Sequence, residues 1–181
     1  MRTSSQQPVT AEVPTFDELR ELMVSRKPPL TARVLQRRLD EPDRSATVIY
    51  DGLNGWYIDD GVRIELRPAE DRAVLVEDGV VERYGPRMDV YVHGWVKLAL
   101  DPRRMAELEE ATGSVVGREV LLERDCWIAT VMGLRADDEA EFTLHVDVES
   151  GVVVRIARED LPGEVLEVRE LRLGTVHVPE R

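Results

Sequence analysis

Short runs in which every second residue is apolar, separated by glycine-containing turns, limit more than any other feature how this chain can fold. Val62–Leu66, Phe142–Val146 and Val152–Ile156 all show this period of two. The pattern is typical of antiparallel strands with one covered face and one face in water. Between the runs stand pairs such as Asp60-Gly61 and Ser150-Gly151, which favour the positive φ angles of tight hairpin turns. The sequence therefore predicts a long antiparallel meander.

About eleven strands are expected between these turns. The last strand changes phase, because Leu166 and Val168 have one parity while Leu171 and Leu173 have the other. A one-residue bulge at Arg169-Glu170 would keep all four apolar side chains on one face. The expected strands cover residues 30–39, 45–51, 55–59, 62–67, 72–77, 80–84, 115–124, 126–132, 141–148, 152–158 and 164–173.

A helix is expected before the meander, over residues 15–26. Thr15 and Glu18 have the spacing of a capping box, in which each side chain accepts a hydrogen bond from the other residue's backbone N–H. Pro28-Pro29 ends the helix. Its apolar stripe, which should pack against another element, consists of Phe16, Leu19, Leu22 and Met23.

A second helix is expected inside the meander, over residues 102–112. Asp101 is suited to cap it, Pro102 to occupy its first position and Gly113 to end it. Two helices beside a run of antiparallel strands indicate the α+β class, built on one curved sheet.

Composition limits the partners of the chain. It has 181 residues, 36 acidic against 24 basic side chains, a net charge of −12 and one cysteine. The length suits a single domain, which we place at residues 14–178 behind a flexible tail of residues 1–13. The acidic balance argues against nucleic acid and anionic membranes, since both bind clustered Lys and Arg. One cysteine excludes an internal disulfide and a zinc site of several thiolates.

The start of the chain lacks an apolar run of about seven residues, which a secretory signal requires. No stretch of the sequence is apolar and long enough to span a bilayer. The sequence therefore predicts a cytoplasmic location and no membrane span.

Residues that could carry catalysis or bind a metal are scattered. Cys126 lies in an alternating run beside Trp127, which predicts a buried structural thiol rather than a nucleophile. His93, His145 and His177 stand far apart and lack the spacing of metal ligands. We therefore expect no enzyme, no metal and no cofactor.

The aromatic residues are more informative. Trp56, Trp95 and Trp127 fall on or near expected strands, and Phe142 lies on a covered face. A curved sheet lined by such side chains forms either a filled core or the wall of an apolar pocket. The filled core is the default, and the small number of helices available to cover so many strands, two short ones, adds weight to the pocket.

Two stretches resemble the LolA-like group, which includes the bacterial lipoprotein carriers LolA and LolB and the amino-terminal domain of the sigma-factor regulator RseB. Ser45–Tyr57 looks like the group's strand, turn and strand ahead of a tryptophan. Residues 117–155 look like its closing strands, and Asp147, Gly151 and Arg155 match the pattern there. His145-Val146 stands where tryptophan or tyrosine is common. The likeness covers about residues 30–178.

This resemblance implies an unclosed half-barrel whose concave apolar face, under a helical lid, accepts acyl chains or a partner peptide. The chain departs from the carriers because it has neither an export signal nor a lipid-anchoring cysteine near its start.

We therefore expect a non-enzymatic protein that binds an apolar ligand, such as a lipid acyl chain, or a hydrophobic protein segment in the concave face. The 102–112 helix would gate that face. The alternative is a structural or protein-interaction module with a fully packed sheet, whose function lies at an exposed edge or on its acidic surface. The expected lining residues are Trp56, Ile64, Trp127, Phe142 and Leu144.

Overall fold

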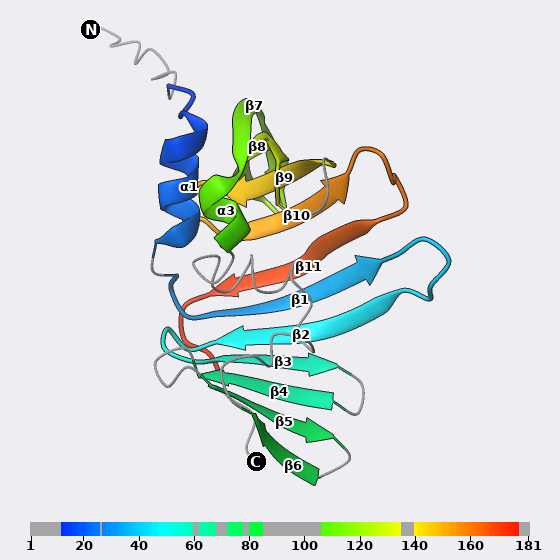
Figure 1. Cartoon of the computed structure of the whole chain (residues 1–181). Helices are drawn as coiled ribbons and strands as arrows, with labels where there is room; N and C mark the ends of the chain where they lie inside the picture. Colours follow the sequence, from blue (N-terminus) through cyan, green and yellow to red (C-terminus); the bar gives the residue numbers. More distant parts are fainter. Residues whose placement is uncertain are drawn as a thin grey trace, which may run out of the picture.

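An eleven-stranded antiparallel sheet forms the body of the molecule (Figure 1). The computed structural model describes residues 12–25, 27–59, 62–67, 72–77, 80–84, 106–134 and 140–177. Its strands are β1 (Leu30–Arg37), β2 (Arg44–Tyr50), β3 (Gly55–Asp59), β4 (Val62–Arg67), β5 (Arg72–Glu77), β6 (Val80–Tyr84), β7 (Thr112–Leu121), β8 (Arg124–Met132), β9 (Glu141–Asp147), β10 (Val153–Arg158) and β11 (Val165–Leu173).

The strand order is β6-β5-β4-β3-β2-β1-β11-β10-β9-β8-β7. Two meanders, β1–β6 and β7–β11, thus meet at the antiparallel pair of β1 and β11 in the middle of the sheet. Within the described ranges β6 and β7 are the two edges, so the sheet is unclosed. The α+β class with a curved, open antiparallel sheet is confirmed.

The strand predictions are correct except at one hairpin. We expected a strand over residues 115–124, whereas β7 ends at Leu121 and β8 begins at Arg124. Leu122 and Glu123 form the turn with φ angles of 54° and 60°. Positive φ is uncommon in residues other than glycine, and neither residue has the turn chemistry of Asn, Asp or Gly. The turn therefore left no signal in the sequence.

The bulge in the last strand is confirmed. Arg33 of β1 pairs with Glu170, and the next residue, Val34, pairs with Val168, which leaves Arg169 as the extra residue. Leu166 and Val168 are buried, and Leu171 and Leu173 pack against the same core. One inserted residue thus keeps both halves of β11 on the covered face.

Helix α1 (Phe16–Val24) lies over one end of the sheet, beside the short helix α3 (Ala106–Glu110) and strands β7–β10 (Figure 1). The capping box of Thr15 and Glu18 is present. The predicted stripe is confirmed as well, with Phe16, Leu19 and Met23 buried and Leu22 partly buried. Residues 101–105 of the expected helix region lie outside the described ranges, and the expected end at residue 112 was wrong, since α3 ends at Glu110 and both Thr112 and Gly113 already pair with β8 as part of β7.

Arg20 joins the two helices. Its Nη1 donates to the carbonyl oxygen of Glu109 at 3.1 Å and its Nη2 to that of Ala111 at 3.0 Å. These carbonyls belong to the end of α3, where helical hydrogen bonds run out. The guanidinium carbon also lies 5.1 Å from the centre of the Phe16 ring. Neither helix, nor any other in the described part of the chain, is long and apolar enough to cross a membrane.

Candidate functional site

Four of the five predicted lining residues share the covered face of the sheet. Phe142 and Leu144 of β9 lie opposite Val131 and Ala129 of β8, and Trp127 lies two residues before Ala129. Ile64 is on the same face but on β4, in the other meander. All four side chains are buried, with exposures of 2 % for Ile64, 7 % for Trp127 and 0 % for Phe142 and Leu144. They form one hydrophobic core with α1.

Trp56 is on the opposite face, so its placement beside Ile64 was wrong. Residues opposite each other in an antiparallel pair share a face. Ile64 lies opposite Tyr57, whereas Trp56 lies opposite Ile49 and Glu65. The pairing of Asp59 with Val62 sets this register. The same register follows from the sequence if Asp60-Gly61 is taken as a two-residue hairpin turn. Trp95 and His93 lie outside the described residues.

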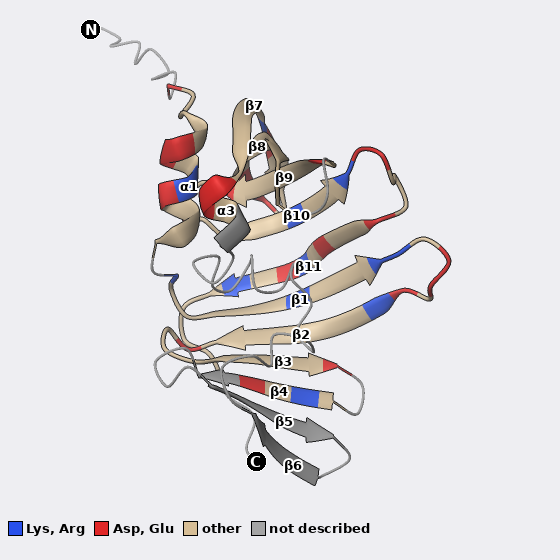
Figure 2. Ribbon diagram, viewed as in Figure 1, with Lys and Arg blue, Asp and Glu red and all other residues tan. Residues whose placement is uncertain are grey.

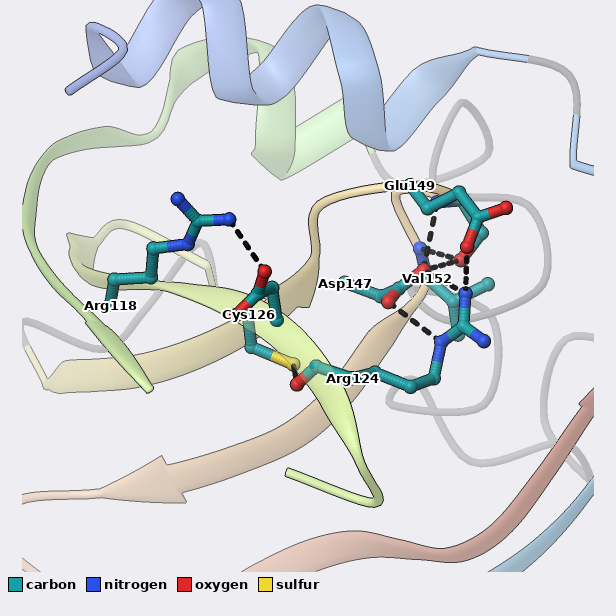
Figure 3. A network of polar contacts seen from close by, with 8 residues as sticks. Arg118, Arg124, Cys126, Asp147, Glu149 and Val152 are labelled. Carbon is teal, nitrogen blue, oxygen red and sulfur yellow. Dashed lines mark hydrogen bonds and ion pairs between the residues drawn. The ribbon is translucent and has the colours of Figure 1, made fainter. Parts of the chain in front are cut away.

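Asp147, the carboxylate that matched the LolA-like pattern, organises the hairpin between β9 and β10 (Figure 3). Arg124 donates to both its oxygens, from Nε at 2.8 Å and from Nη2 at 3.1 Å. Ser150 adds its backbone N–H at 2.8 Å and its hydroxyl. Burial alone would raise the pKa of Asp147, but the hydrogen bonds from Arg124 and Ser150 outweigh it and hold the pKa below its ordinary value. The carboxylate therefore shapes a turn and shows no catalytic feature.

Gly151, the second matching residue, lets this hairpin reach α1. Its φ is 66°, and an added Cβ would lie 2.3 Å from the carbonyl oxygen of Leu22. The Lys27 ammonium donates to the carbonyl oxygens of Leu22 and Met23, at 3.1 and 2.6 Å, and so closes the end of α1. Gly151 thus marks where the sheet holds the helix, whereas Arg155, the third matching residue, pairs with His145 and Glu167 within the sheet.

The side chain of His145 is buried. Its ring Nε2 lies 3.0 Å from a carboxylate oxygen of Glu119, across β8. Burial lowers the pKa of His145, and the nearby positive charge of Arg155 lowers it further. The hydrogen bond to Glu119 raises the pKa but does not outweigh the burial. In the described part of the chain, no three His, Cys, Asp or Glu side chains lie close enough to hold a metal ion.

Cys126 should react slowly with thiol reagents in the folded protein. The side chain is fully buried, and burial, with nearby Asp147, raises its pKa to about 11. Near neutral pH this leaves about a hundredfold less thiolate than an ordinary thiol has. Labelling followed by absorbance should be slow in buffer and fast in urea. Rapid labelling of the folded chain would contradict the structural assignment.

The feature that the sequence did not reveal is the exposure of β7. This ten-residue strand pairs with β8 on one side, and on its other side no described strand pairs with it. Val116 and Val120 are 60 % and 64 % exposed. Val115 pairs with Ala129 and Gly117 with Ile128, so Val116 is the extra residue of a bulge. Gly117–Leu121 is therefore the regular part of this edge, and among the described strands only β8 pairs with it.

Comparisons with known proteins bear on the fold. No protein-family model matches the sequence, and no curated protein matches it. A crystal structure of MucB superposes with a TM-score of 0.54 at 17 % identity, over 90 % of this chain and 58 % of MucB. The chain has a LolA/RseB-like fold. The resemblance predicted from Ser45–Tyr57 and residues 117–155 is thus confirmed for the architecture.

Two other solved structures are more distant. The complex of MucA and MucB from Pseudomonas aeruginosa matches with a TM-score of 0.49 at 18 % identity, over 90 % of this chain and 57 % of that one. A LolA superfamily protein from Nitrosomonas europaea matches with a TM-score of 0.41 at 10 % identity, over 89 % of this chain and 92 % of that one. In the two MucB structures, by contrast, the chain spans less than three fifths of the MucB chain.

Proposed function

We propose that this chain is a non-enzymatic binding protein that takes up an extended segment of a partner protein along the free edge of β7. The observation that carries the proposal is the exposed, unpaired side of this strand. A sheet edge presents a row of free backbone N–H and C=O groups, to which an added strand can pair. Gly117–Leu121 offers this row without a bulge.

The edge is poorly protected against such pairing. Proteins usually blunt an edge with a short strand, proline or several charged side chains. β7 has ten residues, no proline and only Arg118 and Glu119 as charged residues. Both charged side chains are already engaged within the sheet, Arg118 by Asp125 and Glu119 by His145, and the bulge at Val116 lies outside Gly117–Leu121. The exposed Val120 would pack against an apolar residue of the added strand.

A partner segment fits the geometry better than an acyl chain in the covered face. Trp127, Phe142 and Leu144 are at most 7 % exposed under the packed sheet and helices. An apolar ligand would have to displace α1. This helix is bound to α3 through Arg20 and packs against the sheet at Gly151. MucB has been crystallised with MucA(peri), so a protein partner is in keeping with that structure, although the likeness concerns the fold alone.

The test uses peptides selected from a random display library on the folded full chain. Hydrogen exchange should show that the selected peptides protect amides of Gly117–Leu121. The double variant Val116→Lys/Val120→Lys should bind the selected peptides about tenfold more weakly, because lysine on an edge opposes strand addition. Leu39→Lys/Leu53→Lys is the matched control, since these residues are 58 % and 62 % exposed but lie in turns away from β7. The control should bind like the parent chain.

Two results would contradict the proposal. One is protection confined to strands other than β7. The other is an equal loss of affinity in the test and control variants. A parallel titration with a fluorescent fatty acid addresses the apolar-ligand function, which predicts quenching of Trp127 and displacement of α1.

A further inference from the structure

A groove of about 620 Å³ lies on the face of the sheet opposite to the core. Its floor comes from β11, β1, β2 and β3, in the middle of the sheet and away from β7. The segment after β11 forms a wall through Thr175 and His177. A hydrogen bond of 2.8 Å from the Gly174 N–H to the Pro29 carbonyl oxygen fixes where this segment leaves the sheet.

Arg33 occupies the centre of the floor. It lies opposite Glu170 on one side and Thr47 on the other, and Thr47 lies opposite Ile58. Thr31, two residues before Arg33, and Ser45, two residues before Thr47, also line the groove. The groove is thus lined by one arginine of β1 together with hydroxyl-bearing residues of two adjacent strands, β1 and β2. Within the described part of the chain, none of these hydroxyls makes a side-chain hydrogen bond.

The charges in the groove are loosely paired. Glu170 lies 4.0 Å from the Arg33 guanidinium and 3.9 Å from that of Arg172, whereas Arg124 and Asp147 approach to 2.8 Å. Two guanidinium groups therefore face one carboxylate, in a chain whose net charge is −12. Figure 2 shows blue and red segments next to each other on β11 and β1. Among the described residues, neither Arg33 nor Arg172 donates a hydrogen bond, so their N–H groups are available.

We propose that this groove binds the phosphate group of an organic molecule, with Arg33 as its principal ligand. This function is separate from the binding proposed for β7. A phosphate monoester has three terminal oxygens, which match a guanidinium together with the hydroxyls of Thr31 and Thr47 better than the two oxygens of a carboxylate do. The volume lies in the range of about 300–1,000 Å³ that is typical of small-molecule sites, far above that of phosphate alone. The rest of the molecule lies toward Ile58.

Trp56 gives this site an optical reporter. It lies opposite Ile49, which in turn lies opposite Thr31 at the groove floor. Trp127 is on the other face of the sheet. A ligand in the groove should therefore change the emission of Trp56 and leave that of Trp127 unaltered. A Trp95→Phe/Trp127→Phe variant leaves Trp56 as the only tryptophan of the chain and so records its emission alone.

The experiment titrates the full chain with inorganic phosphate, with phenyl phosphate and with phosphatidylcholine vesicles with or without phosphatidic acid. Phenyl phosphate or the phosphatidic acid vesicles should bind more tightly than inorganic phosphate. Arg33→Gln should weaken this binding about tenfold, and Glu170→Gln should strengthen it several-fold, because it removes the competing carboxylate. Arg169→Gln is the matched control, since it changes the net charge equally but Arg169 pairs with Glu167 outside the groove.

The two phosphate sources are distinguished by which probe binds. Arg33-dependent binding of phenyl phosphate assigns a soluble ligand, whereas Arg33-dependent binding of phosphatidic acid vesicles alone assigns a lipid headgroup. No binding of any probe at millimolar concentration would overturn the proposal. So would equal effects of Arg33→Gln and Arg169→Gln, or unchanged affinity in Glu170→Gln, in proteins whose melting temperatures match the parent chain.

Discussion

Replacing Asp147 with alanine is expected to lower the free energy of unfolding by about 3 kcal/mol. This is the lower end of the range for removing one partner of a buried ion pair. The side chain of Asp147 is 2 % exposed, and its loss leaves Arg124 and two donors of Ser150 without their acceptor. Glu149, 2.8 Å from Arg124, still neutralises the guanidinium and limits the cost. Urea unfolding followed by circular dichroism measures the change.

The matched control is Asp125→Ala on the neighbouring strand β8. Asp125 pairs with Arg118 at 2.7 Å, but its side chain is 54 % exposed. Exposed ion pairs contribute about 0–1 kcal/mol, so this variant should remain close to the parent chain. Similar losses in both variants would show that Asp147 acts as an ordinary surface charge.

The effect of Asp147 should depend on pH with a defined sign. Its folded-state pKa is lowered from the ordinary value of 3.8, so its contribution is fully present above that value and is lost as the pH falls below it. His145, with a pKa lowered from 6.5, begins to destabilise the fold at a higher pH in both proteins. The difference in stability between the parent and Asp147→Ala should therefore be constant near neutral pH and shrink only below 3.8.

Gly151→Ala is the second substitution with a large expected effect, again about 3 kcal/mol. The new Cβ would strain a backbone with φ of 66° and would lie 2.3 Å from the Leu22 carbonyl oxygen. Backbone strain of this kind and overpacking each cost about 1–3 kcal/mol. The clash is with backbone, so α1 itself must move. Hydrogen exchange should show faster exchange in α1 as well as lower overall stability.

Gly133→Ala separates the two causes. Gly133 has a similar φ of 82°, but an added Cβ would meet only the Cα of Ala111 at 3.6 Å, an ordinary contact. This variant should lose stability through backbone strain alone and leave exchange in α1 unchanged. If both glycine variants lose the same free energy of unfolding, the close contact between Gly151 and the Leu22 carbonyl oxygen of α1 contributes nothing to the loss.

Local patterns in the sequence were enough for the strands, the bulge and the first helix. A period of two, a phase slip at Arg169-Glu170 and the capping box of Thr15 each depend on residues close in the chain. The fold class and the LolA-like resemblance followed from their order.

Features that depend on pairing between distant strands were out of reach. Nothing local indicates that β7 is an edge, because this follows from which strand lies beside which. The groove requires β11 to lie beside β1, which brings Glu170 opposite Arg33. Trp56 was misplaced because the register of β3 and β4 was not followed through their turn. The domain bounds 14–178, the gating by residues 102–112 and the cytoplasmic location stay predictions.

The pairing of β1 with β11 also determines how the molecule must fold. Leu30 pairs with Leu173, so the central ladder of the sheet joins the first and the last strand residues that the structure describes. Each meander can form from neighbouring hairpins, but the two can merge only after this long loop closes, which is a slow step in proteins with many distant contacts. Loss of β11 would therefore divide the sheet into two parts, each with a new exposed edge, instead of shortening it at one side.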